Sequence, residues 1–255
     1  MVTGAAEPGL AMLGAFRDAT GLVQESAGKV RDAWQALTGG LHDLAHRRRD
    51  DAVTRAFAAE IEQSLAAADA LVSRMRPDLE AVVDALTATA VRAGPVFALF
   101  DAAISMGDAA EHLSGLSAEM TGRAGPETWR GAAREGYDRR VREQAGAADA
   151  AAADVVSASG WLMAIGAANT AYVTNVGHLG AELVGRLAEA AVEAVEATPG
   201  EAPRLVTTLE RLAEFLTSSR SRVAGWRRDL QNQFAATLAR AEEPRPAGWP
   251  AATVE

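Results

Sequence analysis

The chain of 255 residues contains no cysteine, and aromatic residues make up only 5% of it. Without cysteine, neither a disulfide framework nor a zinc–thiolate site can form. Strand-length runs of β-branched and aromatic residues are almost absent, whereas alanine supplies much of the apolar half of the composition. Alanine is the best helix former and a poor strand former. The composition therefore predicts an all-α protein, an elongated antiparallel helical bundle held by many small contacts.

Acidic residues outnumber basic ones, and the formal net charge is −9 at neutral pH. Because nucleic-acid binding requires a basic surface, this charge argues against DNA or RNA as a partner. It argues in the same way against an anionic membrane surface. The first 21 residues lack a basic segment, and Glu7 and Asp18 interrupt them, which is not the pattern of a cleaved signal peptide. We expect a protein that is cytoplasmic, or that leaves the cytoplasm without a cleaved leader.

One segment, 155–181, carries no formally charged residue and is long enough to cross a bilayer. Its Asn169, Asn175 and His178 are costly at bilayer depth, and its apolar residues are mostly small. A helix buried in a bundle, with its polar side chains hydrogen-bonded, fits this composition better. Membrane insertion of the segment stays as an alternative.

Apolar residues recur with a helical period along the first third of the chain. A first helix is predicted over 10–37, and the glycine pair at 39–40 is expected to end it. A second helix begins at Leu41 or after Arg49, and because its stripe keeps phase across Pro77 we expect a kink there. The predicted core residues of both helices are Phe16, Val23, Val30, Trp34, Leu37, Phe57, Ile61, Leu65, Ala68, Leu71, Met75, Leu79, Val82 and Leu86.

Proline and glycine residues mark the remaining predicted helix boundaries. Pro95 is expected in the first turn of a third helix, because proline is tolerated there. After a break at 122–127, a very long helix is predicted over 128–198, ending at Thr198-Pro199-Gly200. A last helix covers 203–240, with an apolar stripe from Leu205 to Leu238. The predicted regions are an N-terminal helical region that packs on a hairpin (1–94), the hairpin (95–198), a C-terminal amphipathic helix (199–243) and a disordered tail (244–255).

Five glycines lie among the alanines of the long helix. They are Gly160, Gly166, Gly177, Gly180 and Gly185. Each costs up to about 1 kcal/mol relative to alanine in a helix interior, so their number indicates close approach of another helix. Packing within the bundle and packing against a second chain both stay open.

One spacing is typical of a metal-binding helix. His42 and His46 fall on one helical face, as the two histidines of H-E-x-x-H do in zinc proteases. An aspartate replaces the glutamate, His112 and His178 have no ligand-like surroundings, and the arginines at 47–49 are a poor setting for a dication. We expect a solvated helix start here and no metal site.

Enzyme signatures are equally scarce. The sequence has no glycine-rich phosphate loop after a strand and no serine elbow, and Glu111 and His112 are adjacent rather than three apart as in di-iron bundles. We therefore expect a protein that is not an enzyme, with no catalytic residues, no cofactor and no metal.

The most informative stretch is PETWRGAAREGYDRR, residues 126–140. Trp129 stands at the mouth of the long helix, Gly131 removes a side chain beside it, and Tyr137 follows eight residues later on a nearby face. Small residues keep the turns between them thin, so two helices can pack closely at a hairpin. The pattern is carried by Trp129, Gly131, Ala132, Ala133 and Tyr137.

This stretch resembles the WXG (Trp-x-Gly) family of type VII, or ESX, secretion proteins from actinobacteria and their relatives. Those proteins are leaderless helical hairpins with Trp-x-Gly in the turn, followed by small residues and an aromatic one. The resemblance covers about 100 residues, 96–195, within a longer chain, as in extended family members. The family's export signal, Tyr-x-x-x-Asp/Glu, is missing, because Val141 follows Tyr137 and Val176 follows Tyr172 at the acidic position.

The resemblance implies a non-enzymatic protein associated with type VII secretion, either a secreted substrate or its partner. It implies packing against another WXG-type helical protein or a second copy, and against the secretion machinery. The protein would be cytoplasmic before export and then secreted or attached to the cell surface, with Trp129 and Gly131 as the docking turn. The alternative is a cytoplasmic helical scaffold or assembly protein in which Trp129 only anchors the core.

Overall fold

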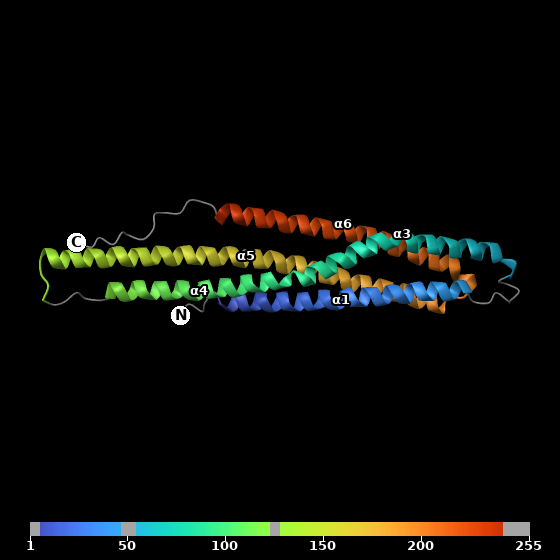
Figure 1. Ribbon diagram of the computed structural model, residues 1–255, viewed down its shortest axis with the longest axis horizontal. Helices are drawn as coiled ribbons and strands as arrows, with labels where there is room; N and C mark the ends of the chain where they lie inside the picture. The colour runs from blue at the N-terminus through green and yellow to red at the C-terminus, as the bar shows by residue number, and fades with distance from the viewer. Residues whose placement is uncertain (1–5, 47–54, 123–127, 242–255) are drawn as a thin grey trace. The chain divides into compact units, whose positions relative to one another are not determined.

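The computed structural model describes residues 6–46, 55–122 and 128–241. These residues form α-helices and one short 3-10 turn, and they contain no strand (Figure 1). The all-α class predicted from the alanine-rich composition is therefore confirmed. In chain order the elements are α1 (Ala6–His46), α3 (Ala58–Val91), α4 (Ala93–Gly122), α5 (Ala132–Glu196), the 3-10 turn Pro199–Glu201 and α6 (Ala202–Ala241).

The prediction that the glycine pair at 39–40 ends the first helix is wrong. α1 continues to His46. A Cβ added at Gly40 would lie 3.1 Å from a methyl carbon of Val195 and 3.2 Å from the Cβ of Ala194 on α5. Gly40 thus serves close packing between helices, and that packing offsets a helix-propensity cost of about 1 kcal/mol.

Both prolines occupy the helical positions that the sequence predicts. Pro77 is inside α3, which continues on both sides of it, and Pro95 is in the first turn of α4. The long helix starts later than predicted, at Ala132. Residues 128–130 are not helical, and Gly131 has a left-handed φ of 64°.

α5 contains 65 residues, which corresponds to about 98 Å at 1.5 Å per residue. The predicted stop at Thr198-Pro199-Gly200 is confirmed, and a capping box marks it. A carboxylate oxygen of Glu201 accepts hydrogen bonds from the backbone nitrogen of Thr198 at 2.8 Å and from its hydroxyl at 2.9 Å. These bonds lower the pKa of Glu201 and start the 3-10 turn that leads into α6.

Helix contacts divide the chain into two compact units, each assembled from separate segments. Unit 1 comprises residues 1–14, 94–168 and 232–255, and unit 2 comprises residues 15–93 and 169–231. α1, α5 and α6 contribute residues to both units, so the region predicted as one hairpin is shared between them. The predicted disordered tail lies outside the described residues.

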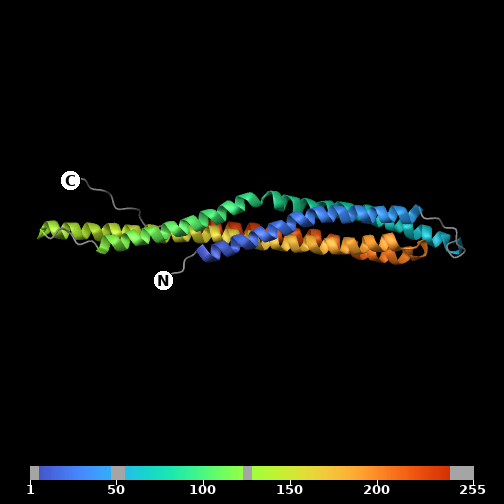
Figure 2. The same ribbon diagram turned by 90° about the horizontal axis from the view of Figure 1, so that it is seen from below.

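In unit 2, parts of α1, α3, α5 and α6 pack around a common core (Figure 2). Phe16, Val23, Val30 and Leu37, which recur at seven-residue steps along α1, are fully buried, and Trp34 is half-buried. Phe57, predicted as a core residue, is 56% exposed because it precedes α3 as its N-terminal cap. The largest fully buried side chains of unit 2 are Phe16, Leu37, Leu44, Met75, Leu86, Leu179, Leu183, Leu187, Leu205, Leu209 and Leu216.

A polar contact joins α3 to α6 at the surface of unit 2. The carboxylate of Asp78 accepts a hydrogen bond from Arg220 at 3.0 Å and one from the Thr217 hydroxyl at 2.9 Å. Both bonds favour the charged carboxylate and lower the pKa of Asp78, with the Arg220 bond as the largest cause.

Unit 1 is built around α4 and the first part of α5, which run antiparallel and side by side in both views (Figures 1 and 2). The hydroxyl of Ser117 donates to the Ala145 carbonyl at 3.1 Å, and that of Ser159 donates to the Ala103 carbonyl at 2.8 Å. Such short side chains reach a neighbouring backbone only where two helices approach closely. The seam is accordingly lined by small buried residues, Ala103, Ala110, Ala145, Ala148 and Ala152.

The α6 part of unit 1 is less covered than its sequence predicts. Leu238, the end of the predicted stripe, is 57% exposed, although Thr237 beside it is buried. The apolar side chains of α6 therefore recur with a helical period up to Leu238, although the described neighbouring helices do not cover Leu238.

Gly180 and Gly185 provide a matched pair of substitutions on α5. A Cβ at Gly180 would lie 2.7 Å from the Cβ of Ser26, whereas a Cβ at Gly185 would meet nothing within 4 Å. We expect Gly180→Ala to destabilise the protein by about 1–3 kcal/mol through overpacking. Gly185→Ala should stabilise it by up to about 1 kcal/mol, because alanine favours the helix. Urea unfolding followed by circular dichroism measures both, and equal effects would contradict the packing described.

We expect Asp78 to make the free energy of unfolding depend on pH in the acidic range. Its folded-state pKa lies below the ordinary value of 3.8, so its stabilising effect is complete above that value and is lost as the pH falls through the folded pKa. The free energy of unfolding of the wild type should therefore fall more steeply in this range than that of Asp78→Asn, whose amide does not titrate. Urea unfolding at a series of acidic pH values tests this, and identical pH dependence in the two proteins would refute it.

Candidate functional site

The turn before α5 depends on one glycine. Gly131 has φ +64° and is the only residue with a positive φ in the part of the chain that the structure describes. Any other L-residue would be strained there by roughly 1–2 kcal/mol. A Cβ at this position would meet nothing within 4 Å, so backbone conformation, and not close packing, requires the glycine.

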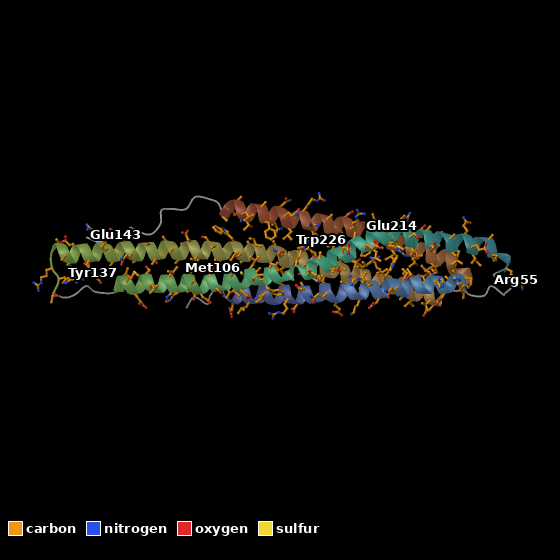
Figure 3. The ribbon with its side chains drawn as sticks, viewed as in Figure 1. Arg55, Met106, Tyr137, Glu143, Glu214 and Trp226 are labelled. Atoms are coloured by element: carbon orange, nitrogen blue, oxygen red, sulfur yellow. The ribbon has the colours of Figure 1, made fainter. Side chains whose placement is uncertain are left out.

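Trp129 is held at this turn by Tyr137. The two ring centroids are 5.6 Å apart and the ring planes are perpendicular, which is the favourable edge-to-face geometry. Figure 3 shows Tyr137 at the N-terminal end of α5. The Trp129 side chain remains 45% exposed. The indole therefore lies fixed at the surface and does not belong to the buried core.

The small residues that follow the turn face open space in the described structure. Ala132 and Ala133 are exposed, and a Cβ at Gly136 would meet nothing within 4 Å. The helix register explains why: Ser117 lies opposite Ala145, so the last residue of α4 lies opposite about residue 140 of α5. The first two turns of α5 extend beyond the end of α4, and close packing begins only further along the helix.

Arginines are frequent in the sequence near the aromatic pair. Residues 128–143 carry five arginines against three acids, Glu135, Asp138 and Glu143, and Arg140 forms an ion pair with Glu143 at 3.7 Å. Arg134 forms an ion pair with Asp138 at 3.0 Å, which contributes under about 1 kcal/mol at such an exposed position. We define the basic aromatic turn as Trp129, Tyr137, Arg130, Arg134, Arg139, Arg140 and Arg142.

The sequence argument from net charge missed this surface. A count over the whole chain averages the arginines of the turn with the acids of every other helix, and the sum is −9. A count over successive short windows would have found it, because the arginines are close together in sequence.

The histidine pair forms no metal centre with other described residues. His42 and His46 are both exposed. Their ring centroids lie 4.2 Å apart, and Nδ1 of His46 is 2.8 Å from the carbonyl oxygen of His42, to which it donates when protonated. Within the described ranges there is no group of three His, Cys, Asp or Glu residues that could hold a metal ion. The arginines at 47–49 lie outside those ranges.

Two helical spans, 58–122 and α5, are long and apolar enough to cross a membrane by length and composition. Mostly buried core helices of water-soluble proteins pass the same test, whereas the most apolar windows of these two spans are 33% and 17% buried. Within the charge-free segment 155–181, the side chains of Val173, Val176 and Leu179 are buried in unit 2. The expected burial in a bundle thus holds for this part of the segment.

Trp129 should matter little for stability. We expect Trp129→Ala to lower the free energy of unfolding by about 0.5–1.5 kcal/mol, the value of an aromatic pair. Phe100→Ala, at a fully buried position of the same unit, should lower it by about 3–5 kcal/mol. Urea unfolding measures both losses. A loss at Trp129 as large as that at Phe100 would identify the indole as a core anchor.

Comparison of the chain with protein-family models, with curated proteins and with solved structures finds no match. What the protein does is therefore inferred from its own residues.

Proposed function

We propose that the protein is a non-enzymatic helical protein of type VII secretion, either a secreted substrate or the partner of one. It acts by docking the basic aromatic turn against another helical protein. The observation that carries this proposal is the exposed Trp129, held by Tyr137 and by the left-handed Gly131 at the connection between two long antiparallel helices.

The composition of the turn suits protein recognition. Tryptophan, tyrosine and arginine are the residues most enriched among those that dominate binding energy at interfaces. Trp129 already packs against Tyr137, and a side chain that is pre-positioned in this way loses less conformational entropy when a partner covers it. Among the described residues, no α4 residue lies opposite the first two turns of α5, and Trp129 is 45% exposed.

The resemblance to the WXG family supplies the biological setting. Trp129 and Gly131 lie between α4 and α5, and Tyr137 follows Trp129 by eight residues; this arrangement supports the resemblance. Because neither tyrosine is followed by an acid at the required position, we infer that a partner carries the export signal. The protein would then be exported from the cytoplasm as part of a complex and would reach the cell surface or the medium.

The proposal is tested in the producing cell. Deletion of the gene for the type VII secretion ATPase should remove the protein from the culture supernatant and leave it in the cytoplasm. Trp129→Ala should have the same effect on export while the melting temperature stays near that of the wild type, because the lost contact is at the surface. Immunoblots of the supernatant and thermal unfolding of the purified protein are the measurements.

Trp226→Ala is the matched control. Trp226 is a half-buried tryptophan in unit 2, with the guanidinium of Arg222 5.1 Å from the centre of its ring, and its removal should leave export unchanged. If the protein is still found outside cells that lack the ATPase, or is never found outside wild-type cells, the secretion function is excluded. A cytoplasmic helical scaffold is then the better description.

A further inference from the structure

Unit 1 contains an apolar groove with a volume of about 760 Å³. It follows the seam between α4 and α5, and we call it the α4–α5 groove. Sites that bind one small organic molecule typically have volumes of about 300–1,000 Å³ and apolar walls with a few polar groups. The lining residues that matter below are Gly107, Glu111 and Ser114 of α4 and Val156, Gly160 and Met163 of α5.

The first turn of α1 closes one end of the groove. Pro8 lines it there, and a Cβ at Gly9 would lie 3.0 Å from Ile104 and 3.6 Å from Met163. Away from α1 the floor is open, because a Cβ at Gly160 would meet nothing within 4 Å and Val156 is 58% exposed. The groove thus has an apolar floor and an end wall formed by α1.

The groove is long in the direction of the helices. The bonds from Ser117 to Ala145 and from Ser159 to Ala103 set the register between α4 and α5, and they place Ser114 level with about residue 148 of α5. Met163, at the α1 end, is about 15 residues further along α5, which corresponds to about 22 Å. This length suits the extended alkyl chain of a single-chain amphiphile better than a compact ligand.

Polar groups gather at the end of the groove that lies away from α1. Glu111 and Ser114 both line it, and residues three apart on a helix are neighbours on one face. Asp149 is exposed and precedes Val156 by seven residues, so it lies on the same face of α5. Two carboxylates and a hydroxyl therefore bound this end, and all three accept hydrogen bonds.

The two lining helices carry no cation beside these carboxylates. Residues 93–122 contain no lysine or arginine, and neither do residues 143–185. Arg142 follows the groove face of α5, but it lies one heptad before Asp149, about 10 Å further from the groove. At the α1 end, Glu7 is exposed next to Pro8. An anionic head group is therefore disfavoured in the groove, and a cationic one is favoured.

We propose that the α4–α5 groove binds a long-chain primary amine, an unbranched alkyl chain that ends in an ammonium group. The ammonium has three N–H donors and donates to Glu111 and Ser114. The alkyl chain lies over Gly107 and Gly160 and ends against Met163. A quaternary ammonium fits less well, because it has no N–H donor and the described lining residues include no aromatic ring that could hold it. The inference does not depend on the secretion proposal.

Titration with matched amphiphiles tests the class of ligand. We expect isothermal titration calorimetry of the full chain to show one dodecylammonium ion bound per chain at concentrations below micelle formation. Decylammonium should bind up to about fifteenfold more weakly, because two fewer methylenes are buried. Dodecyltrimethylammonium and dodecyl sulfate should each bind at least about tenfold more weakly, because neither can form the charge-assisted hydrogen bonds.

Filling the groove tests the location. Gly160→Leu should raise the dissociation constant for dodecylammonium at least about tenfold, because its side chain occupies the path of the alkyl chain. Gly185→Leu is the control, since Gly185 is an equally open glycine on the same helix, in unit 2, and it should leave the constant unchanged. Circular dichroism verifies that each variant is folded.

Removing one carboxylate tests the head-group contact. Glu111→Gln should raise the constant about fivefold, the upper end for an exposed ion pair. Glu80→Gln changes the net charge equally at an exposed position of α3 in unit 2, and it should have no effect. This pair separates a local contact from the general attraction of a cation to a chain of net charge −9.

Three results would overturn the inference. They are no binding of dodecylammonium to the wild type, dodecyl sulfate binding as tightly as dodecylammonium, and an affinity that survives both Gly160→Leu and Glu111→Gln.

Discussion

The structure depends on the close approach of α5 to its neighbours. Gly180 accommodates Ser26 and Leu86, and Ser159 reaches the backbone of α4 at 2.8 Å. These contacts require small residues on one helix wherever the other helix comes near. A chain with 5% aromatic residues has few bulky side chains with which to build a thick core. It compensates with many short distances, because dispersion attraction accumulates over numerous well-placed atom pairs.

Much of the helical fold could be predicted from the sequence, because the apolar period of a helix is a local property. The stripe of α1 and the positions of Pro77 and Pro95 are examples. Gly40 shows the limit. A glycine that stops a helix and one that admits a neighbouring helix look alike in sequence, and only the position of α5 opposite Gly40 distinguishes them.

The exposure of the residues at the candidate site could not be predicted from the sequence. Trp129 and Tyr137 could be paired from their spacing, whereas the accessibility of the indole depends on where α4 ends relative to α5. That relation follows from the register between the two helices, as in the Ser117–Ala145 bond, and the apolar period within either helix does not contain it. An apolar groove in unit 1 was equally hidden, because its lining residues come from α1, α4 and α5.

Gly131 has a wider consequence. The direction in which the chain enters α5 depends on one left-handed residue. The exposed side chains around this residue contribute little to the buried core. The exposed residues around the turn and the residues of the buried core thus occupy separate stretches of the sequence. The surface presented at the turn can therefore be changed by single substitutions while the helices beneath it keep their packing.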